Sequence, residues 1–319
     1  MSAAAADEGA PPRLVHHALL YGSDGEFLSA TEPFCREGLA AGDRVLAVTT
    51  AANIGLLRAA LGGDADRVEF AEAADWYDAP GRALAAYDRY VDAHRNGHGR
   101  MRVIGEAAWH GRSAAEDAEW IRYESVLNAA FAGRPAWILC PYDERAVPGH
   151  IVADARRTHP ELLTPGGDAE PSAAYVEPEL FACEHDTLPL PPPPAHPLAD
   201  FPFDGDLYFM RRAVRSALAP LGTSEERVGL LLLAVNEVVS NAVEHGGGHG
   251  RLVLWADGPV VVCDVTDPGQ MKRLLPGYLP PPPMSARGHG LWVVRRLCEL
   301  VQIRSGDQGT QIRLHMARG

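Results

Sequence analysis

A proline-rich segment near the middle of the chain limits which elements can cross it. Residues 185–200 read HDTLPLPPPPAHPLAD. Proline lacks a backbone N–H and its ring fixes φ, so such a run is excluded from helix interiors and central strands and favours an extended conformation. We therefore predict a semi-rigid linker over 185–200, with one domain on each side. The length of 319 residues is enough for two domains.

Before this segment, apolar runs typical of strands alternate with segments of helical periodicity. The predicted strands cover residues 14–21, 44–50, 67–73, 101–109 and 136–143, and the predicted helices 26–40, 52–61, 82–94, 115–131 and 149–158. This alternation indicates a parallel sheet with helices on both faces. We predict a doubly wound α/β domain over 12–184, after a disordered leader over 1–11.

The order of elements changes after the proline-rich segment. Helices are predicted at 206–219, 223–244 and 290–298, and strands at 251–257, 260–267, 301–306 and 310–316; the second helix starts at a capping box, Thr223-Ser-Glu-Glu226. This order predicts an α+β sandwich over 201–319, with helices on one face of a mixed sheet. A second proline run, 279–283, predicts a long loop of the kind that often forms a lid.

Charge and cysteine content argue against several classes of protein. The net charge is −13, whereas binding to nucleic-acid phosphates needs clustered Lys and Arg. The five cysteines are odd in number and none are at CxxC spacing, which fits free thiols in a reducing cytosol better than disulfides or a zinc site. The residues at the start, MSAAAADEGAPP, favour a disordered leader over a signal peptide, and we find no apolar run of membrane-spanning length. We expect a soluble, cytoplasmic protein without nucleic-acid or membrane partners.

The turn after the first predicted strand has the layout of a phosphate-binding loop but the wrong charges. It reads GSDGEF, between a strand and a helix. The chemistry of such a loop needs a Lys for the outer phosphates and a Ser or Thr for magnesium, but this region carries Asp24 and Glu26. Two carboxylates repel a triphosphate, so we predict that this domain does not hydrolyse nucleotides.

Short motifs in the first half resemble those of the MEDS sensory domain. In chain order they are HHALLY, FCREGLAAGDRVLAVTT, WYD, GEAAW, YESVLN, LCPYD and THP, within about residues 12–163. The resemblance implies a RecA-like fold with a degenerate P-loop and a sensory or regulatory role. It does not identify a ligand.

Ligands of open α/β sheets bind beyond the carboxyl ends of the strands. This rule places aromatic and acidic side chains near one rim: Tyr21, Glu106, Trp109, Tyr142 and Asp143. We predict a sensory pocket there. The alternative is that these are ordinary loop and core residues, with His16 and His17 inside the sheet.

In the second half, polar residues interrupt an apolar helix at NEVVSNAVEHGGG, 236–248. Glu237 and Asn241 are four residues apart and so share one helix face. An amide oxygen is a hard ligand suited to Mg²⁺, and a carboxylate one turn away can reach a hydroxyl beside that metal.

Three further segments follow in order. CDVTDPGQ ends a strand at Asp267, whose carboxylate can accept from an exocyclic amine, and Gly269 allows backbone to approach a flat ring. RGHGL places Gly288 and Gly290 before a helix whose N-terminus can hold phosphate. A Gly-Thr pair at 309–310 opens the last strand.

Together, over about residues 203–318, these segments resemble the GHKL ATPase fold, and more narrowly the anti-sigma-factor serine kinases of bacteria. The resemblance implies a Bergerat-type α/β sandwich that binds ATP and Mg²⁺, with Asn241 on the metal and Glu237 as general base. It implies adenine recognition by Asp267, Gly269 and Thr310, and phosphate contacts from Arg287, Gly288 and Gly290. The implied partners are a sigma factor that the domain sequesters and an antagonist protein that it phosphorylates on serine; a homodimer stays open.

Two alternatives remain beside the serine kinase. One is a binding module that holds a partner without phosphotransfer. The other is a sensor histidine kinase, which would need a two-helix hairpin with a phosphoacceptor His, whereas LYFMRRAVRSALAPLG contains none. One position departs from the family, since Met271 stands where a second glycine is usual. This departure and the proline run before Arg287 predict weaker ATP binding.

Overall fold

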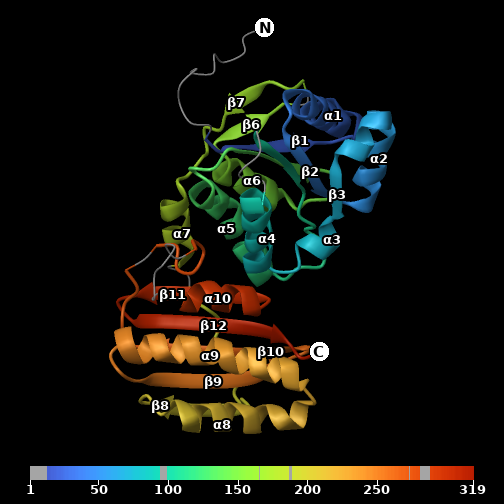
Figure 1. Ribbon diagram of the computed structural model, residues 1–319. Helices are drawn as coiled ribbons and strands as arrows, with labels where there is room; N and C mark the ends of the chain where they lie inside the picture. The colour runs from blue at the N-terminus through green and yellow to red at the C-terminus, as the bar shows by residue number, and fades with distance from the viewer. Residues whose placement is uncertain (1–12, 94–98, 165, 187–188, 273, 281–287) are drawn as a thin grey trace. The chain divides into compact units, whose positions relative to one another are not determined.

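The computed structural model describes residues 13–93, 99–164, 166–186, 189–272, 274–280 and 288–319 (Figure 1). These residues divide into two compact units, each described by itself below. The first is drawn from Met1–Trp76, Tyr87–Gly111 and Leu127–Val176, and the second from Tyr77–Ala86, Arg112–Val126 and Glu177–Gly319.

A seven-stranded sheet organises the N-terminal part. Its strands are β1 (Val15–Tyr21), β2 (Arg44–Thr49), β3 (Glu69–Glu72), β4 (Met101–Gly105), β5 (Ala136–Asp143), β6 (Glu161–Leu163) and β7 (Ala169–Pro171), in the order β3-β2-β4-β5-β1-β6-β7. The β6–β7 pair is antiparallel, and the other neighbouring strands are parallel. The predicted parallel α/β sheet is therefore confirmed except at the antiparallel β6–β7 pair.

The helices between these strands are α1 (Asp24–Ala41), α2 (Ala51–Leu61), η1 (Gly62–Arg67), α3 (Ala73–Trp76), α4 (Pro80–Ala93), α5 (Ala114–Ala130) and α6 (Gly149–Thr158). The next helix, α7 (Pro178–Asp186), follows β7 and is part of the second unit. Alternation along β1 serves both faces of the sheet. Leu19 and Tyr21 share a buried core with α1 and α2. On the other face, His16 contacts Asn128 of α5.

A five-stranded sheet organises the C-terminal part. Its strands are β8 (Ala199–Phe203), β9 (Gly250–Asp257), β10 (Val260–Asp267), β11 (Leu300–Gly306) and β12 (Gly309–Ala317), in the order β11-β12-β10-β9-β8. Every neighbouring pair is antiparallel, so the predicted mixed sheet is wrong. The strands β9 and β10 form one antiparallel hairpin, and β11 and β12 form another. The two hairpins are joined by the antiparallel pairing of β10 with β12. The edge strand β8 uses the last two residues of the proline-rich segment.

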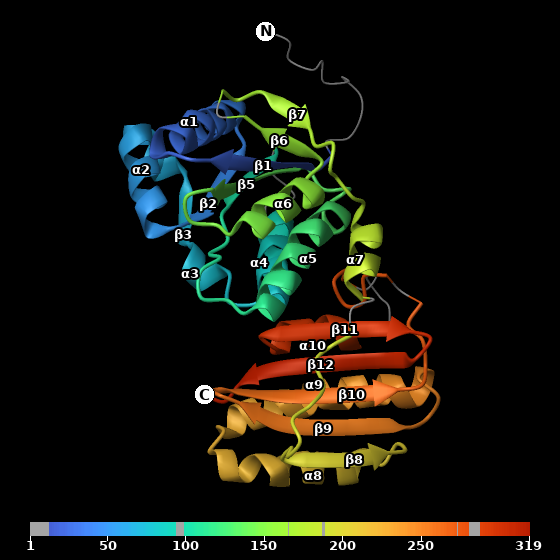
Figure 2. The same cartoon turned by 180° about the vertical axis from the view of Figure 1, so that it is seen from behind.

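The helices of this part are α8 (Leu207–Leu218), the short η2 (Ala219–Leu221), α9 (Glu225–His245) and α10 (Gly290–Leu297). Opposite views place α8, α9 and α10 on one face of the sheet (Figures 1 and 2). The apolar side of α9, including Val235, Val238 and Val239, is buried in a core with Leu252 and Leu314 from the strands. The predicted capping residue of α9 is wrong by one position, because Ser224 and not Thr223 accepts the N–H of Arg227.

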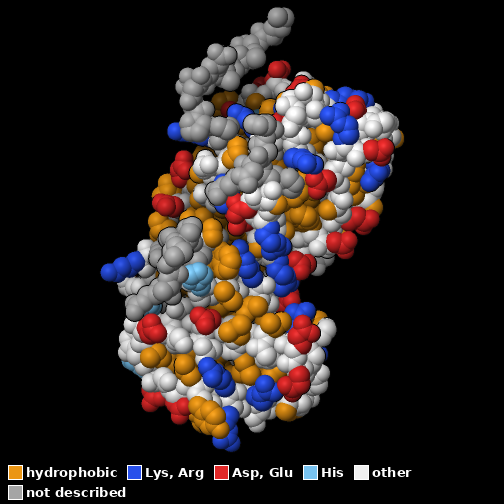
Figure 3. All heavy atoms as spheres, viewed as in Figure 1, with side chains coloured by type: hydrophobic (Ala, Val, Ile, Leu, Met, Phe, Trp, Pro, Cys, Tyr) orange, Lys and Arg blue, Asp and Glu red, His pale blue; other side chains and the backbone are white. Residues whose placement is uncertain are grey.

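None of the described helices combines the length and the apolar content that crossing a bilayer requires. On the face seen in Figure 3, acidic and basic side chains are interspersed.

Candidate functional site

A cavity of about 390 Å³ lies among α9, the loop after β10 and the start of α10, within the C-terminal unit. Its lining residues are Val238, Asn241, Ala242, His245, Gly246, Asp267, Gly269, Gln270, Met271, Pro276, Gly277, Gly288, Gly290, Leu291, Thr310 and Ile312. Volumes of this size are typical of small-molecule and cofactor sites. The lining includes most of the predicted ATP-site residues: Asn241, Asp267, Gly269, Gly288, Gly290 and Thr310. Arg287 lies outside the described residues.

The side chains of Glu237 and Asn241 meet the first residue of α10. A Cβ atom built on Gly290 would lie 2.9 Å from Oε2 of Glu237 and 3.4 Å from Nδ2 of Asn241. Both side chains are half-buried. The four-residue spacing on α9 therefore brings a carboxylate and an amide to the first residue of α10; Asn241 lines the cavity, whereas Glu237 is not one of its lining residues.

The N-terminus of α10 lines the cavity too. Its N-cap, His289, makes no side-chain capping hydrogen bond. The first N–H groups of a helix have no acceptor within the helix, and the helix dipole places partial positive charge there. The turn before it uses Gly288 at φ 90°, a conformation that favours glycine. The start of α10 is suited to an anion.

A chain of hydrogen bonds fixes the loop that follows β10. The hydroxyl of Thr310 donates to the carbonyl of Gly269 at 2.8 Å, so its own proton is committed. Ser305 Oγ lies 2.9 Å from Thr310 Oγ1 and therefore donates to it, while it accepts the N–H of Met271 at 2.7 Å. Thr310 thus supports the loop and can only accept from a ligand.

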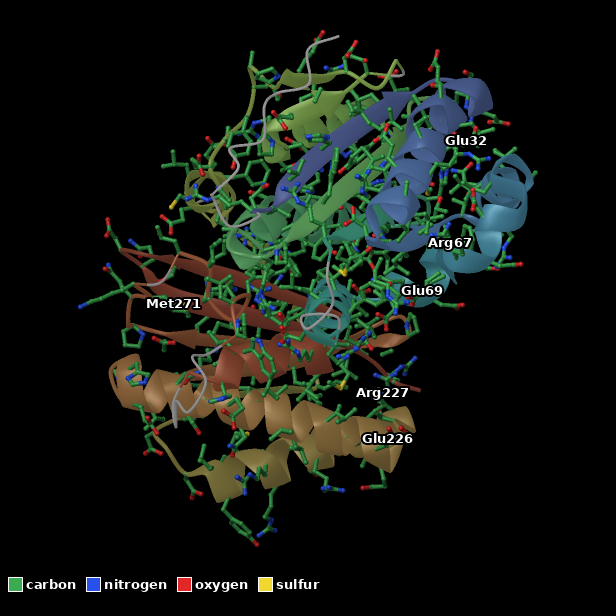
Figure 4. The ribbon with its side chains drawn as sticks, turned by 45° about the horizontal axis from the view of Figure 1, so that its top comes forward. Glu32, Arg67, Glu69, Glu226, Arg227 and Met271 are labelled. Carbon is green, nitrogen blue, oxygen red and sulfur yellow. The ribbon has the colours of Figure 1, made fainter. Side chains whose placement is uncertain are left out.

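Ser305 was not predicted from the sequence. It stands on β11 outside the motifs noted in the sequence, and its relevance comes from the β11–β12 register, which pairs it with Thr310. Met271 is half-buried and follows β10 (Figure 4). Its backbone contributes an N–H to the network, while its side chain packs against the core of the sandwich.

Asp267 also lines the cavity, and it lies beside Gly246 at the end of α9. One of its oxygens, Oδ1, accepts the N–H of Gly269 at 2.8 Å. Among the described residues, Oδ2 receives no such bond, so it is the oxygen left for a ligand donor. Burial raises the pKa of this carboxyl above its usual value, although the Gly269 N–H and His249 oppose the shift.

Glycines let the loop and the end of α9 touch. A Cβ on Gly269 would lie 2.4 Å from Cα of Gly246, and a Cβ on Gly246 would lie 2.2 Å from Oδ1 of Asp267. Neither position has room for a side chain, so the carboxylate of Asp267 is held against the backbone of α9.

A second cavity, of about 220 Å³, lies at the carboxyl ends of the strands in the N-terminal unit. Tyr21, Glu106, Trp109 and Asp143 of the predicted sensory pocket line it. Tyr142 does not. It is buried, because the residue before Asp143 points to the other face of the sheet, and its ring stacks on Trp109 with centroids 6.1 Å apart.

The carboxylate of Glu106 is buried but fully engaged. It accepts from the Tyr21 hydroxyl at 2.8 Å, from the Asn53 amide at 2.8 Å and from the Thr49 hydroxyl. Burial, together with the negative charge of Glu106, raises the pKa of Tyr21. The sequence analysis did not predict a role for Thr49 or Asn53. Thr49 looks like an ordinary residue at the end of a strand, and Asn53 like an ordinary residue at the start of a helix.

The acidic residues of the glycine-rich turn are also engaged within this unit. Asp24 accepts from Arg145 at 2.9 Å, and the same guanidinium group pairs with Asp143 at 2.8 Å. Glu26 accepts the backbone N–H of Gly22 at 2.7 Å. The turn therefore binds its own backbone N–H with a carboxylate, where a phosphate-binding loop would offer that N–H to a ligand.

Comparison with known families gives both halves a counterpart. Residues 15–160 match the family model MEDS, the MEthanogen/methylotroph, DcmR Sensory domain. Residues 205–316 match the histidine kinase-like ATPase domain. The chain joins a MEDS domain to a histidine kinase-like ATPase domain. The resemblance to the MEDS domain and the broader resemblance to the GHKL-type ATPase fold are thereby confirmed.

No curated protein matches the chain. Among solved structures, it is similar to the RsbU and RsbW domains of Rv1364c from Mycobacterium tuberculosis, with 21% identity and a TM-score of 0.29. That match covers 37% of this chain and 32% of the other, so the chain spans about a third of that structure. The larger cavity lies within the residues that match the ATPase model, and the smaller one within those that match the MEDS model.

Proposed function

We propose that the ATPase-like domain binds Mg-ATP in its cavity and transfers phosphate to a serine of an antagonist protein, and that it sequesters a sigma factor. The observation that carries the proposal is the convergence of Glu237, Asn241 and the start of α10 beside a cavity that Asn241, Gly290 and Asp267 line. The ATPase family of this domain supports ATP as the ligand.

Asp267 and the start of α10 suit the two ends of the nucleotide. Oδ2 of Asp267 would accept the exocyclic amine of adenine, and the hydroxyl of Thr310 could accept from the same group directly or through water. At the other end, the N–H groups at the start of α10 would hold phosphate oxygens. The polyphosphate would therefore run from the loop after β10, residues 267–269, toward the start of α10.

The donor set beside α10 fits magnesium. Mg²⁺ prefers oxygen ligands and keeps several waters, so a single amide from Asn241, aided by phosphate oxygens, is a suitable protein contribution. When bound, the ion would neutralise charge on the phosphates.

Glu237 would act as the base for phosphotransfer. The serine oxygen attacks the γ-phosphorus, the bond to the β,γ-bridging oxygen breaks, and ADP leaves. The hydroxyl proton passes to the carboxylate of Glu237. Phosphoryl transfer depends mostly on positioning and charge neutralisation, so one well-placed carboxylate suffices as the protein's base.

We further propose that the MEDS domain biases this activity in response to a signal. A parallel sheet with a glycine-rich turn after β1 supports the RecA-like fold that its motifs imply. The engagement of Asp24 and Glu26 argues against a triphosphate at that turn.

Calorimetry with Mg-ATP tests the site. Asn241→Ala should abolish measurable binding, whereas the matched control Asn236→Ala should not, because Asn236 lies on the same helix but hydrogen-bonds Arg211. Unchanged affinity in Asn241→Ala would refute the assignment of the site.

Labelled ATP and candidate antagonist proteins test the reaction. Glu237→Gln should keep ATP binding and lose phosphoserine formation. If the wild-type protein transfers no phosphate but still captures its partners, the alternative of a non-catalytic binding module replaces the kinase. Capture of a sigma factor from the native cytosol, identified by mass spectrometry, tests the partner.

A further inference from the structure

Three metal-binding side chains gather inside the MEDS domain. His16 on β1, Cys140 on β5 and His159 after α6 each offer a ligand atom, and these atoms all lie within 4.8 Å of one another. All three residues are buried. The parallel register of β1 and β5 pairs Ala18 with Cys140, so His16 and Cys140 lie on the same face of neighbouring strands.

Hydrogen bonds fix which ring nitrogen of His159 can bind a metal. Nδ1 lies 2.8 Å from the carbonyl oxygen of Ala155, and because a carbonyl only accepts, Nδ1 carries the proton. Nε2 therefore keeps its lone pair.

The same reasoning applies to His16. The amide nitrogen of Asn128 donates to the carbonyl of Thr158 at 2.7 Å, which turns its oxygen toward His16. Nδ1 of His16, 2.9 Å from that oxygen, donates to it. Nε2 of His16 is then left with its lone pair, 3.4 Å from Sγ of Cys140.

Such an arrangement is what a metal-binding histidine requires. A ligating imidazole usually donates its second N–H to a carbonyl or carboxylate, which fixes the tautomer and the ring orientation. The ring centroids of His16 and His159 are 4.1 Å apart.

We propose that Nε2 of His16, Nε2 of His159 and Sγ of Cys140 bind a Zn²⁺ ion in the MEDS domain. Two imidazoles and a thiolate match the ligand preference of zinc. Zinc bonds of about 2.05 Å to nitrogen and 2.3 Å to sulfur give a tetrahedral N–S edge of about 3.6 Å, close to the 3.4 Å between His16 and Cys140. Binding releases the thiol proton of Cys140 to solvent.

The three ligands come from separate elements of one unit and are all buried. A zinc ion held by them would tie β1, β5 and the end of α6 together.

The sequence alone argued against a zinc site, because no pair of its cysteines has ligand spacing. The ligands are far apart in the chain and come from separate elements. Only the strand register and the segment after α6 bring them together.

Cobalt titration of the reduced, metal-free full-length protein tests the proposal, since Co²⁺ replaces zinc and reports thiolate ligation through a sulfur-to-cobalt charge-transfer band. We expect one ion per chain, displaced by Zn²⁺, with a thiolate band in the wild-type protein. Cys140→Ser should lose the band. The matched control Cys35→Ser should keep it, because Cys35 is buried in the same domain but lies in the core of the opposite face.

A second variant separates positioning from ligation. Asn128→Ala should retain the band but bind the metal about 10- to 100-fold more weakly, because it removes the partner that orients His16 and leaves the three ligands in place. Circular dichroism checks that each variant is folded.

A folded wild-type protein that shows no thiolate band, or a band undiminished in Cys140→Ser, overturns the proposal. Asn241→Ala should bind cobalt normally, so this outcome is independent of the ATP site.

Discussion

At the start of α10, the absence of a single side chain keeps Glu237 and Asn241 in place. If position 290 carried a side chain, its Cβ atom would lie 2.9 Å from the Glu237 carboxylate, which is a flexible group that can move away. The sequence predicted that these three residues share a site, since helix periodicity fixes the first two and the glycine motif marks the third. It did not predict that the carboxylate and the glycine would be in direct contact.

Gly290→Ala should leave the fold intact and impair the site. The new methyl group displaces Glu237, so we expect phosphotransfer to fall at least about 10-fold, equivalent to about 1.4 kcal/mol. Gly229→Ala is the control, because Gly229 on α9 has nothing within 4 Å of its Cβ position. It should raise stability by about 0.5–1 kcal/mol through helix propensity. Equal activity in the two variants would contradict the contact described for Gly290.

The ionisation of Asp267 predicts a pH dependence for ATP binding. Burial raises the folded-state pKa of this carboxyl, so the folded protein keeps a proton that the unfolded chain has already lost. Its contribution to stability therefore decreases as pH rises from the ordinary value through the raised one.

ATP binding should follow the opposite trend, because only the ionised carboxylate accepts fully from the adenine amine. We expect affinity to fall as pH drops through the raised pKa, at higher pH than for an ordinary aspartate. Calorimetry from pH 7.5 to 4.5 measures it, with Asp267→Asn as reference for the titration of ATP itself. Parallel pH curves for the two proteins would exclude Asp267 as the titrating group.

At the scale of elements, periodicity predicted most of what the structure contains. Helices such as α6 and strands such as β10 have the predicted bounds, because long amphipathic or apolar segments carry a clear signal. The strands β6 and β7 were missed, since three residues are too few to show alternation. Strand direction in the second sheet was also wrong, because periodicity says which residues form strands and not which neighbours they choose.

Ser305 shows the same limit for the site, and it gives a prediction. Ser305→Ala removes the acceptor for the Met271 N–H and the donor to Thr310, so it should destabilise the domain by about 1–3 kcal/mol and weaken ATP binding. Chemical denaturation and calorimetry measure the two effects. Ser216→Ala, at an exposed position on α8, should change neither. A Ser305→Ala protein with unaltered ATP affinity would show that the loop needs no such support.

Across the whole chain, four of the five cysteines are buried: Cys35, Cys140, Cys263 and Cys298. Cys140, Cys263 and Cys298 lie in apolar runs of the sequence, whereas Cys35 lies on α1. Burial raises the pKa of Cys35 to about 12 and that of Cys263 well above its usual value. Thiols in such surroundings are inert, because the thiolate is the reactive form.

Native-state alkylation at pH 8 should therefore label Cys183, which is exposed on α7, and leave Cys35 and Cys263 unlabelled until the protein unfolds. Mass spectrometry of peptides from native and denatured samples measures this. Rapid labelling of Cys263 in the native protein would contradict the burial described for the second sheet.

The contact between Gly246 and Gly269 has a consequence for how this protein can vary. A side chain at either position would occupy space held by the other's backbone or by Asp267. A larger residue at one position cannot be compensated by a smaller residue at the other, because both positions already hold glycine. A saturation library should accordingly return glycine alone at both positions among active clones, even when both are randomised together.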